Sequence, residues 1–401
     1  MSSQVERLLR GVDRVETAAE LQARLDESHK TGKPLRVKLG IDATGPDIHL
    51  GFAVPLRKLR QFQDEGHIAV LIVGDFTAKV GDPSGRSKTR PQLTDEEVKT
   101  NMERYKEQVF RILDERKSEI RYNGEWSDPL RGADIIKIAS KYTVARIIER
   151  EDFRNRLEAG APVHMHELLY PLFQGYDSVA VRADVELGGA DQYWNLLVGR
   201  ELQREYGQRP QVVMTLPLLL GLDGVQKMSK SYGNYVGITE APKEMFGKVM
   251  SIADSMLLDY FRLCTDRDEP AVKALEQRLA SGENPRNVKV ELAKDIIALY
   301  HSPREAEEAA QEFDRVFRDR QLPDEMPEFR VPAAGINVID LVVSSGLVPS
   351  KSEARRKLAE GAFYIDGERV TDPALLVRAG AEPLVLKFGK RHFLRLVAAP
   401  K

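Results

Sequence analysis

Two short polar segments, far apart in the chain, hold residue types that bind polyphosphates. In Asp42–Phe52, DATGPDIHLGF, a turn-rich break leads into His49 and Gly51. In Lys227–Ser231, KMSKS, two lysines and two hydroxyls lie between turn residues. Ammonium groups on a mobile loop can close on phosphate oxygens. The two segments therefore suggest a nucleotide site, although a helix-capping histidine and a solvated charge cluster are alternative interpretations.

The first segment lies between a predicted strand and a predicted helix. Residues 35–41 roughly alternate apolar and polar side chains, which predicts a strand with a polar end. From Leu50 to about Glu65, apolar residues recur at near-helical spacing, which places His49 in the first helical turn. The free N–H groups of a helix start suit an anion, and Gly51 lets a flat ring approach the backbone.

Further apolar runs extend this unit into a predicted parallel sheet. The run 67–75 is nearly continuous, as in a strand buried on both faces, and it completes a strand–helix–strand unit. Further strands are predicted at 120–123, 184–187 and 211–220, with helices at 1–33, 94–119, 130–165, 167–180 and 193–206. We therefore predict an α/β fold with a Rossmann-like parallel-sheet catalytic domain over residues 1–236. A glycine-rich stretch at 81–87 has the wrong spacing for a P-loop, and no G-x-G-x-x-G motif is present.

A helical face at 167–180 combines an amide, a phenol and a carboxylate. Tyr170, Gln174 and Asp177 are spaced at i, i+4 and i+7, so they share one side of the helix. Burying such groups unpaired is costly, and a polar ligand would satisfy them. An internal hydrogen-bond network is the alternative. The following strand ends in Gly188–Gln192, GGADQ, at the position where open α/β sheets bind ligands.

Composition is that of an ordinary globular chain. The 401 residues suffice for two or three domains, and 42% are hydrophobic and 30% charged, with a net charge of −2. One cysteine, Cys264, excludes an intrachain disulfide. With neither a run of transmembrane length nor a signal-like stretch, we expect no membrane partner and a cytoplasmic protein. His164 and His166 have no further ligands nearby in the sequence, so no metal site is predicted.

The C-terminal part is predicted to contain two smaller domains. Residues 237–322 are expected to be all helical, and the proline-containing stretch 323–335 to be a linker. Residues 336–401 hold eleven Lys and Arg against seven Asp and Glu. They predict a helix–turn–helix with its bases on the second helix, followed by a hairpin with an Asp366-Gly367 turn. A basic helix beside a small sheet fits RNA phosphates, with a solvated face as the alternative.

In their order and separation, the two polyphosphate segments resemble the HIGH and KMSKS signatures of class I aminoacyl-tRNA synthetases. KMSKS matches in all five positions. The first signature matches His49 and Gly51 but has Leu50 for Ile and Phe52 for the second His. With the 170–177 face, the GGADQ turn and a C-terminal module that resembles the S4 RNA-binding domain, essentially the whole chain is similar to the tyrosyl-tRNA synthetase family. Many members have Tyr where this chain has Lys38.

The resemblance implies a tyrosine–tRNA ligase. Such an enzyme activates L-tyrosine with ATP to tyrosyl-adenylate and pyrophosphate, then transfers tyrosyl to the 3′ end of tRNA(Tyr). It further implies Mg²⁺ bound with ATP, no protein-bound structural metal, and a homodimer formed through a connective insertion at about 125–165. Residues 237–322 would form the anticodon-side domain.

The resemblance also assigns residues to roles. The catalytic residues are expected to be Thr44, His49, Lys227 and Lys230. ATP is expected to contact Asp42, His49, Gly51, Gly189, Asp191, Leu219, Leu220 and Lys230. Tyrosine is expected to contact Asp82, Tyr170, Gln174, Asp177 and Gln192, and RNA to contact Lys351, Arg355, Arg356 and Lys357.

Three other functions remain open. Tryptophanyl-tRNA synthetase shares the expected fold but lacks the S4-like module. A nucleotidyltransferase can contain an HxGH-type motif without the lysine loop. A non-catalytic RNA-binding or splicing protein could have kept a synthetase fold, although every matched catalytic position except Phe52 holds a usable residue.

Overall fold

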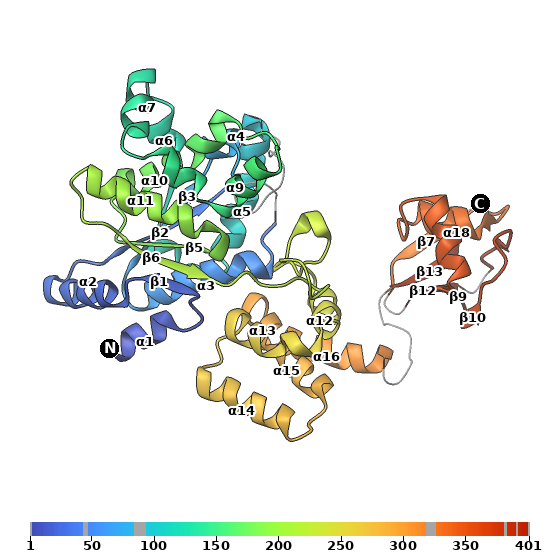
Figure 1. Cartoon of the computed structure of the whole chain (residues 1–401). Helices are drawn as coiled ribbons and strands as arrows, with labels where there is room; N and C mark the ends of the chain where they lie inside the picture. Colours follow the sequence, from blue (N-terminus) through green and yellow to red (C-terminus); the bar gives the residue numbers. More distant parts are fainter. Residues whose placement is uncertain are drawn as a thin grey trace. The chain divides into compact units, whose positions relative to one another are not determined.

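The computed structural model describes residues 2–42, 47–83, 94–317, 326–380, 383–389 and 392–399. The chain forms two compact units, Met1–Glu307 and Glu308–Lys401 (Figure 1). The division falls within helix α16 (Pro303–Phe317). Residues 237–307 therefore belong to the same compact unit as the sheet, whereas the end of α16 falls in the second unit.

The first unit is built on a six-stranded sheet of order β1-β6-β5-β2-β3-β4. Its five parallel strands are β2 (Arg36–Ile41), β3 (Ile68–Val73), β4 (Ser118–Tyr122), β5 (Val185–Gly189) and β6 (Val212–Leu216). All five coincide with predicted strands, so the predicted α/β fold with a parallel sheet is confirmed. The last strand ends earlier than predicted, at Leu216, because Pro217 follows it.

One strand was not predicted. β1 (Arg14–Glu16) lies antiparallel to β6 at the sheet edge, between α1 (Ser3–Leu9) and α2 (Ala18–Thr31). The interpretation of residues 1–33 as wholly helical is therefore wrong at these three residues. β1 contains a single apolar residue, Val15, and no apolar run marks it.

Helices cover both faces of the sheet. Figure 1 shows α10 (Met165–Val181) and α11 (Tyr193–Glu205) on one side and α3 (Leu50–Asp64) on the other. In β3, all residues but the first are buried, which explains its continuous apolar sequence. β2 and β5 are neighbours, whereas β3 and β6 lie to opposite sides of them. This is the switch point at which open α/β sheets bind ligands.

The remaining helices of this unit lie before and after β6. Those before β6 are α4 (Thr77–Val80), α5 (Asp95–Val109), η1 (Glu115–Lys117), α6 (Gly124–Ser127), α7 (Gly132–Ala139), α8 (Val144–Ile148), α9 (Glu151–Glu158) and η2 (Ala190–Gln192). Those after β6 are η3 (Lys230–Tyr232), α12 (Pro242–Met250), η4 (Asp254–Met256), α13 (Leu257–Cys264), α14 (Glu269–Ala280) and α15 (Pro285–Tyr300). The helix predicted to reach 119 ends at Val109, and η1 and β4 follow it. Among the described residues, no helix is long and apolar enough to cross a membrane.

The second unit is a small α+β domain. Its main sheet has the order β10-β9-β12-β13-β7, and a two-stranded sheet pairs β11 with β8. The strands are β7 (Glu328–Val331), β8 (Ile336–Asn337), β9 (Phe363–Ile365), β10 (Glu368–Arg369), β11 (Leu376–Val377), β12 (Leu384–Phe388) and β13 (His392–Ala398). The helices are α17 (Val338–Ser344) and α18 (Lys351–Ala359).

Two features of this domain bear on the predictions. Asp366 and Gly367 both have positive φ, at 48° and 86°, so the predicted tight turn between β9 and β10 is confirmed. β7 lies inside the stretch 323–335 that was expected to be a linker, and it pairs in parallel with β13. Residues 328–331 are therefore part of the small domain.

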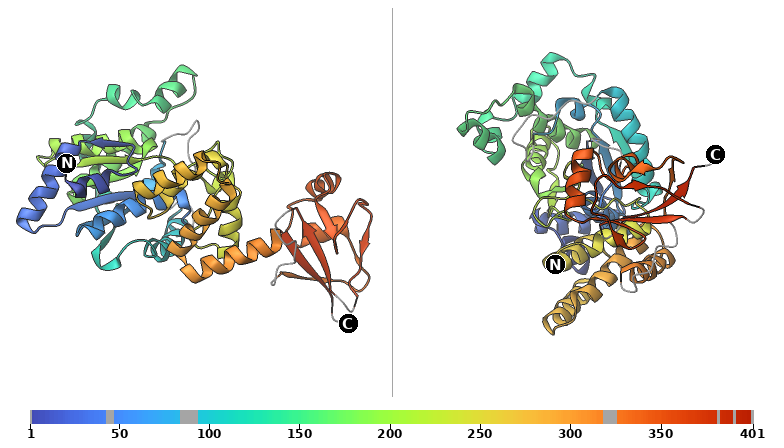
Figure 2. Two further views of the ribbon diagram at one scale, coloured as in Figure 1. Left: turned by 90° about the horizontal axis from the view of Figure 1, so that it is seen from below. Right: turned by 90° about the vertical axis from the view of Figure 1, so that its right-hand side faces the viewer.

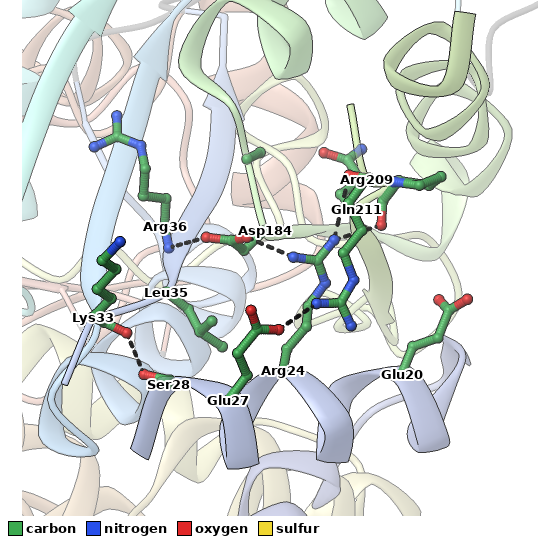
Figure 3. Close-up of polar contacts among 12 residues, drawn as sticks. Glu20, Arg24, Glu27, Ser28, Lys33, Leu35, Arg36, Asp184, Arg209 and Gln211 are labelled. Atoms are coloured by element: carbon green, nitrogen blue, oxygen red, sulfur yellow. Dashed lines mark hydrogen bonds and ion pairs between the residues drawn. The ribbon is translucent and has the colours of Figure 1, made fainter. Parts of the chain in front are cut away.

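A buried arginine joins α2 to the starts of three strands (Figure 3). Arg24 is 4% exposed, and its Nη1 lies 2.5 Å from Asp184 Oδ1, just before β5. Its Nη2 donates to the carbonyl of Pro210, which precedes β6, at 2.7 Å. Asp184 Oδ2 in turn accepts the backbone N–H of Arg36, the first residue of β2, at 3.0 Å.

We predict that Arg24→Ala lowers the free energy of unfolding of the first unit by about 3 kcal/mol, because it leaves the Asp184 carboxylate without its ion-pair partner. Glu27→Ala is the matched control on the same helix. It removes an exposed ion pair with Arg209, and such pairs contribute about 0–1 kcal/mol. Both tryptophans, Trp126 and Trp194, lie in the first unit, so urea unfolding followed by tryptophan fluorescence isolates it. Equal losses in the two variants would contradict the prediction.

Candidate active site

A cavity of about 320 Å³ lies at the carboxyl ends of β2 and β5. The predicted site residues that line it are Asp42, His49, Gly51, Asp82, Tyr170, Gln174, Asp177, Gly189, Asp191, Gln192, Leu219 and Lys227. Leu220 and Lys230 are not among the lining residues. Thr44 lies outside the described residues. The strand–loop–helix, the helical face and the lysine loop therefore converge on one cavity.

His49 is held as a neutral hydrogen-bond donor. It caps α3, and its Nδ1 accepts the backbone N–H of Phe52 at 3.3 Å. In a neutral imidazole the proton then resides on Nε2, which is free to donate. Burial and the neighbouring Lys230 lower the pKa of His49 to about 4, so the ring is uncharged at pH 7.

Phe52 stands where the signature has its second histidine. Its ring is nearly perpendicular to His49 at a centroid distance of 6.4 Å, and to Tyr105 on α5 at 5.9 Å. Edge-to-face pairs of this kind are favourable. Phe52 therefore packs beside His49 but supplies no hydrogen-bond donor to the cavity.

The two signature segments touch each other. The backbone N–H of Gly51 donates to Sδ of Met228 at 3.3 Å, and that of Leu50 donates to the carbonyl of Val236 at 2.9 Å. A Cβ at position 51 would lie 3.2 Å from Met228 Cβ and 3.3 Å from His49 Nδ1. Gly51 is thus the residue that allows the start of α3 and the lysine loop to approach closely.

Both lysines of the loop lie beside carboxylates. Lys227 Nζ is 2.8 Å from Asp191 Oδ2, and Lys230 Nζ is 4.0 Å from Asp47 Oδ2. Burial lowers the pKa of Lys230. The backbone of Gly189 lies close to the Lys227–Asp191 ion pair, since a Cβ at position 189 would lie 2.7 Å from Asp191 Oδ1. This side of the cavity therefore combines cationic side chains with exposed backbone.

The opposite side is rich in acceptors. Tyr170 donates its hydroxyl to Asp42 Oδ2 at 2.9 Å, and Gln192 Nε2 donates to Asp82 Oδ2 at 3.0 Å. Asn195 Nδ2 lies 3.0 Å from the amide oxygens of both Gln174 and Gln192. Two carboxylates and two amides in one wall suit a cationic group.

Asp177 is the buried end of the helical face. It is 3% exposed and accepts hydrogen bonds from Trp126 Nε1 at 2.8 Å and Asn123 Nδ2 at 3.3 Å. Burial is the largest effect on it and raises the pKa of Asp177 to about 7. Asn123 and Trp126 were not predicted. The one available signal was that Asn123 is the last residue of the strand predicted at 120–123, at the end of the sheet where ligands bind.

The four expected RNA-binding residues lie on α18 in the second unit. Lys351, Arg355 and Arg356 are exposed and Lys357 is half-buried. Lys351 pairs with Asp340 at 2.6 Å, Lys357 with Glu360 at 2.8 Å, and Arg356 with Glu353 at 3.3 Å. The helix therefore presents three cationic side chains to solvent.

Comparisons with known proteins place the chain among related sequences. Residues 30–318 match the family model described as "tRNA synthetases class I (W and Y)". The chain belongs to this family. Residues 319–395 match "Tyrosine--tRNA ligase SYY-like C-terminal domain". The chain is 52% identical to "Tyrosine--tRNA ligase" of Moorella thermoacetica over 397 residues, covering 99% of this chain and 96% of the relative. It is 50% identical to the protein of the same name from Carboxydothermus hydrogenoformans over 403 residues, covering 99% and 98%.

Solved structures share the fold. A C-terminally truncated mitochondrial tyrosyl-tRNA synthetase of Aspergillus nidulans matches with a TM-score of 0.65 and 20% identity, covering 79% of this chain and 95% of that chain. A tyrosyl-tRNA synthetase of Archaeoglobus fulgidus, crystallised with L-tyrosine, matches with a TM-score of 0.61 and 23% identity, covering 77% and 98%. A tryptophanyl-tRNA synthetase of Plasmodium falciparum matches with a TM-score of 0.54 and 16% identity, covering 72% and 80%.

We predict that Gly51→Ala slows the ATP-dependent activation step by about 10- to 100-fold, because a Cβ 3.2 Å from Met228 Cβ forces the lysine loop to shift and misaligns the reacting groups. Gly132→Ala is the control, since a Cβ at the start of α7 meets nothing within 4 Å. Single-turnover rates at saturating ATP measure the effect. Unchanged rates in Gly51→Ala would show that the contact between the signatures does not position the loop.

Proposed function

We propose that the chain is a tyrosine–tRNA ligase. It activates L-tyrosine with ATP and transfers the tyrosyl group to the 3′ end of tRNA(Tyr). The observation that carries the proposal is the buried carboxylate of Asp177, placed in the same cavity as the acceptor-rich wall and both signature segments. The names of the relatives that align over nearly the whole chain support it.

In this proposal the amino acid spans the cavity from Asp177 to the acceptor-rich wall. Asp177 accepts the hydrogen of the substrate phenol. The substrate ammonium group binds Tyr170, Gln174 and Asp82, and Gln192 lines the pocket. The carboxylates and amides already converge on this region, which supports the assignment of the ammonium.

ATP is proposed to bind on the side of the lysine loop. Adenosine contacts Asp42, Gly51, Gly189, Asp191, Leu219 and Leu220, and the phosphates contact Thr44, His49, Lys227 and Lys230. Gly51 and Gly189 have no side chain, so the nucleoside can lie close to the backbone at both positions, which supports its placement there. ATP enters with Mg²⁺ on its phosphate oxygens, which are the hard ligands that this ion prefers.

The first reaction requires alignment and charge stabilisation. The tyrosine carboxylate is ionised at pH 7, so one of its oxygens attacks the α-phosphorus without a general base. The bond between the α-phosphorus and the bridging oxygen breaks, and pyrophosphate departs with the negative charge. His49 Nε2–H and the ammonium groups of Lys227 and Lys230 stabilise that charge. A 3′-terminal hydroxyl of tRNA then attacks the tyrosyl carbonyl and AMP leaves.

We predict that Asp177→Asn lowers kcat/KM for tyrosine by about 10- to 100-fold, because one hydrogen bond to a charged acceptor is lost. KM for ATP should change little. In the wild type, protonation of Asp177 below pH 7 should weaken tyrosine binding. This fall in affinity on acidification is the acid limb of the pH profile, and the variant should lack it. Pyrophosphate exchange over a pH series measures both effects. Wild-type selectivity against phenylalanine in the variant would contradict the assignment of Asp177.

The second unit is proposed to hold tRNA through Lys351, Arg355, Arg356 and Lys357. We predict that removal of residues 318–401 leaves pyrophosphate exchange within about twofold but lowers tRNA charging by at least about 100-fold, since phosphate contacts dominate RNA affinity. The cut keeps α16 intact and removes β7 together with its partner β13. Equal retention of both activities would exclude a tRNA-binding role for this unit.

We further propose a homodimer formed through the insertion 125–165. Four apolar side chains there are strongly exposed: Ile136 (70%), Val144 (59%), Leu157 (50%) and Met165 (71%). Exposed apolar groups gathered in one segment suit a protein interface. Figure 2 shows the helices of this segment projecting from the unit. Sedimentation equilibrium should give twice the chain mass of 45.2 kDa, and a monomer mass would contradict the proposal.

As a partner of tRNA, the protein is proposed to act in the cytoplasm.

A further inference from the structure

A lysine is buried at the switch point of the sheet. Lys38 lies in β2 opposite Glu186 of β5, and the two side chains are 0% and 1% exposed. Its Nζ is 2.8 Å from Glu186 Oε1. A buried ion pair pays a large desolvation penalty, and well-packed apolar residues of similar volume are often at least as stable. Fold stability therefore does not by itself account for this pair.

The ammonium group is also bound to α10. Lys38 Nζ donates to the backbone carbonyl of Gln174 at 3.0 Å and to Ser178 Oγ at 2.8 Å. These two acceptors take hydrogen bonds from the ammonium group, whereas Glu186 Oε1 is its ion-pair partner. Ser178 Oγ donates onward to Glu186 Oε2 at 3.0 Å, and Gln211 Nε2 donates to the same oxygen. Every polar contact of the ammonium group thus joins β2 either to β5 or to α10.

The two α10 contacts bracket Asp177. Gln174 and Ser178 stand one helical turn apart, and Asp177 lies between them in the sequence, with Gln174 and Asp177 both lining the cavity. Recognition groups must be held to within about 0.5 Å, which requires supporting contacts behind them. Lys38 supplies such contacts at the turn of α10 that presents Gln174 and Asp177.

The charged and polar groups near Asp177 come from several elements. Lys38 on β2 is the cation that favours its ionised form, and Glu186 on β5 opposes it. Tyr170 on the same helix is protonated, since burial raises its pKa well above the usual value. From β4 and α6 come the uncharged donors Asn123 and Trp126. Arg121 on β4 lies over the Trp126 ring at 5.5 Å.

We propose that Lys38 is a positioning residue for tyrosine recognition. Its ammonium group fixes the turn of α10 that holds Gln174 and Asp177, and its positive charge keeps the Asp177 carboxylate able to accept the substrate phenol. The inference rests on the proposed function. It assigns a task to the position at which many relatives of this fold have a tyrosine.

The charge effect has a defined sign. Burial raises the pKa of Asp177 to about 7, and Lys38 restrains that rise. Removing the cation raises this pKa further, so the loss of tyrosine affinity on acidification begins at a higher pH. Removing the negative charge of Glu186 lowers the pKa of Asp177, so the loss begins at a lower pH. Substitutions of the two paired residues therefore shift the same profile in opposite directions.

The test measures the dissociation constant of L-tyrosine by calorimetry on the full-length protein, at pH values on both sides of 7. We expect Lys38→Met to move the acid limb upward by about one pH unit, and Glu186→Gln to move it downward. The double variant Lys38→Met/Glu186→Gln should have its limb between those of wild type and Lys38→Met. At pH 7, tyrosine affinity in Lys38→Met should fall about fivefold, because the ionised fraction of Asp177 falls from about one half to about one eleventh, with ATP affinity unchanged within about twofold.

Lys58→Met is the matched control. Lys58 is also buried, at 4% exposure, and its Nζ binds the Arg10 carbonyl and Gln61 Oε1 on α3, outside the cavity lining. This variant should lose stability without moving the acid limb. If Lys38→Met and Glu186→Gln leave the limb in place, or shift it in the same direction, the inference is wrong. If the wild type binds no tyrosine, the proposed function itself fails, which is a separate outcome. Should Lys38→Met not fold, Glu186→Gln alone decides the sign.

Discussion

The site depends on the pairing of β2 with β5 in parallel at the centre of the sheet. The chain leaves β2 toward α3 and β3, and leaves β5 toward α11 and β6, so successive connections run to opposite sides of the pair. This geometry opens a cavity at the carboxyl ends of the two strands. It brings residues separated by more than a hundred positions, such as Asp42 and Tyr170, into hydrogen-bond contact.

Around this pairing the protein separates two electrostatic environments. One side has the lysine loop, a neutral His49 and exposed glycine backbone, which suits a polyphosphate. The other side has Asp82, which suits an ammonium group, and buried Asp177, which suits a hydroxyl donor. A zwitterionic amino acid with a polar ring substituent has matching chemistry. Its carboxylate would then face the phosphates, where the reaction takes place.

Local signals in the sequence predicted much of this architecture. The five parallel strands were predicted from short sequence patterns, such as the nearly continuous apolar run at 67–75, and the helical spacing of Tyr170, Gln174 and Asp177 placed them on one face that lines the cavity. His49 differs slightly from its prediction, since it is the N-cap of α3 and not a residue of the first turn. That distinction depends on backbone angles, which periodicity does not define.

Features that depend on distant partners were not predictable. β1 is a strand because it pairs with β6, about 200 residues later, and β7 is a strand because it pairs with β13 near the end of the chain. Asn123 and Trp126 reach Asp177 only through the packing of β4 and α6 against α10. Lys38 was visible in the sequence only as a departure from the family. Its contacts with Glu186, Gln174 and Ser178 required the assembled sheet and helix.

The most direct test of the central claim is ATP–pyrophosphate exchange by the full-length protein with each of the twenty amino acids. A cavity lined by both Asp177 and an acceptor-rich wall predicts exchange with tyrosine far above exchange with phenylalanine or tryptophan, since only tyrosine offers a phenol to the buried carboxylate. Preferential exchange with tryptophan would contradict the assignment of Asp177, and no exchange with any amino acid would contradict the proposal that the chain is an active synthetase.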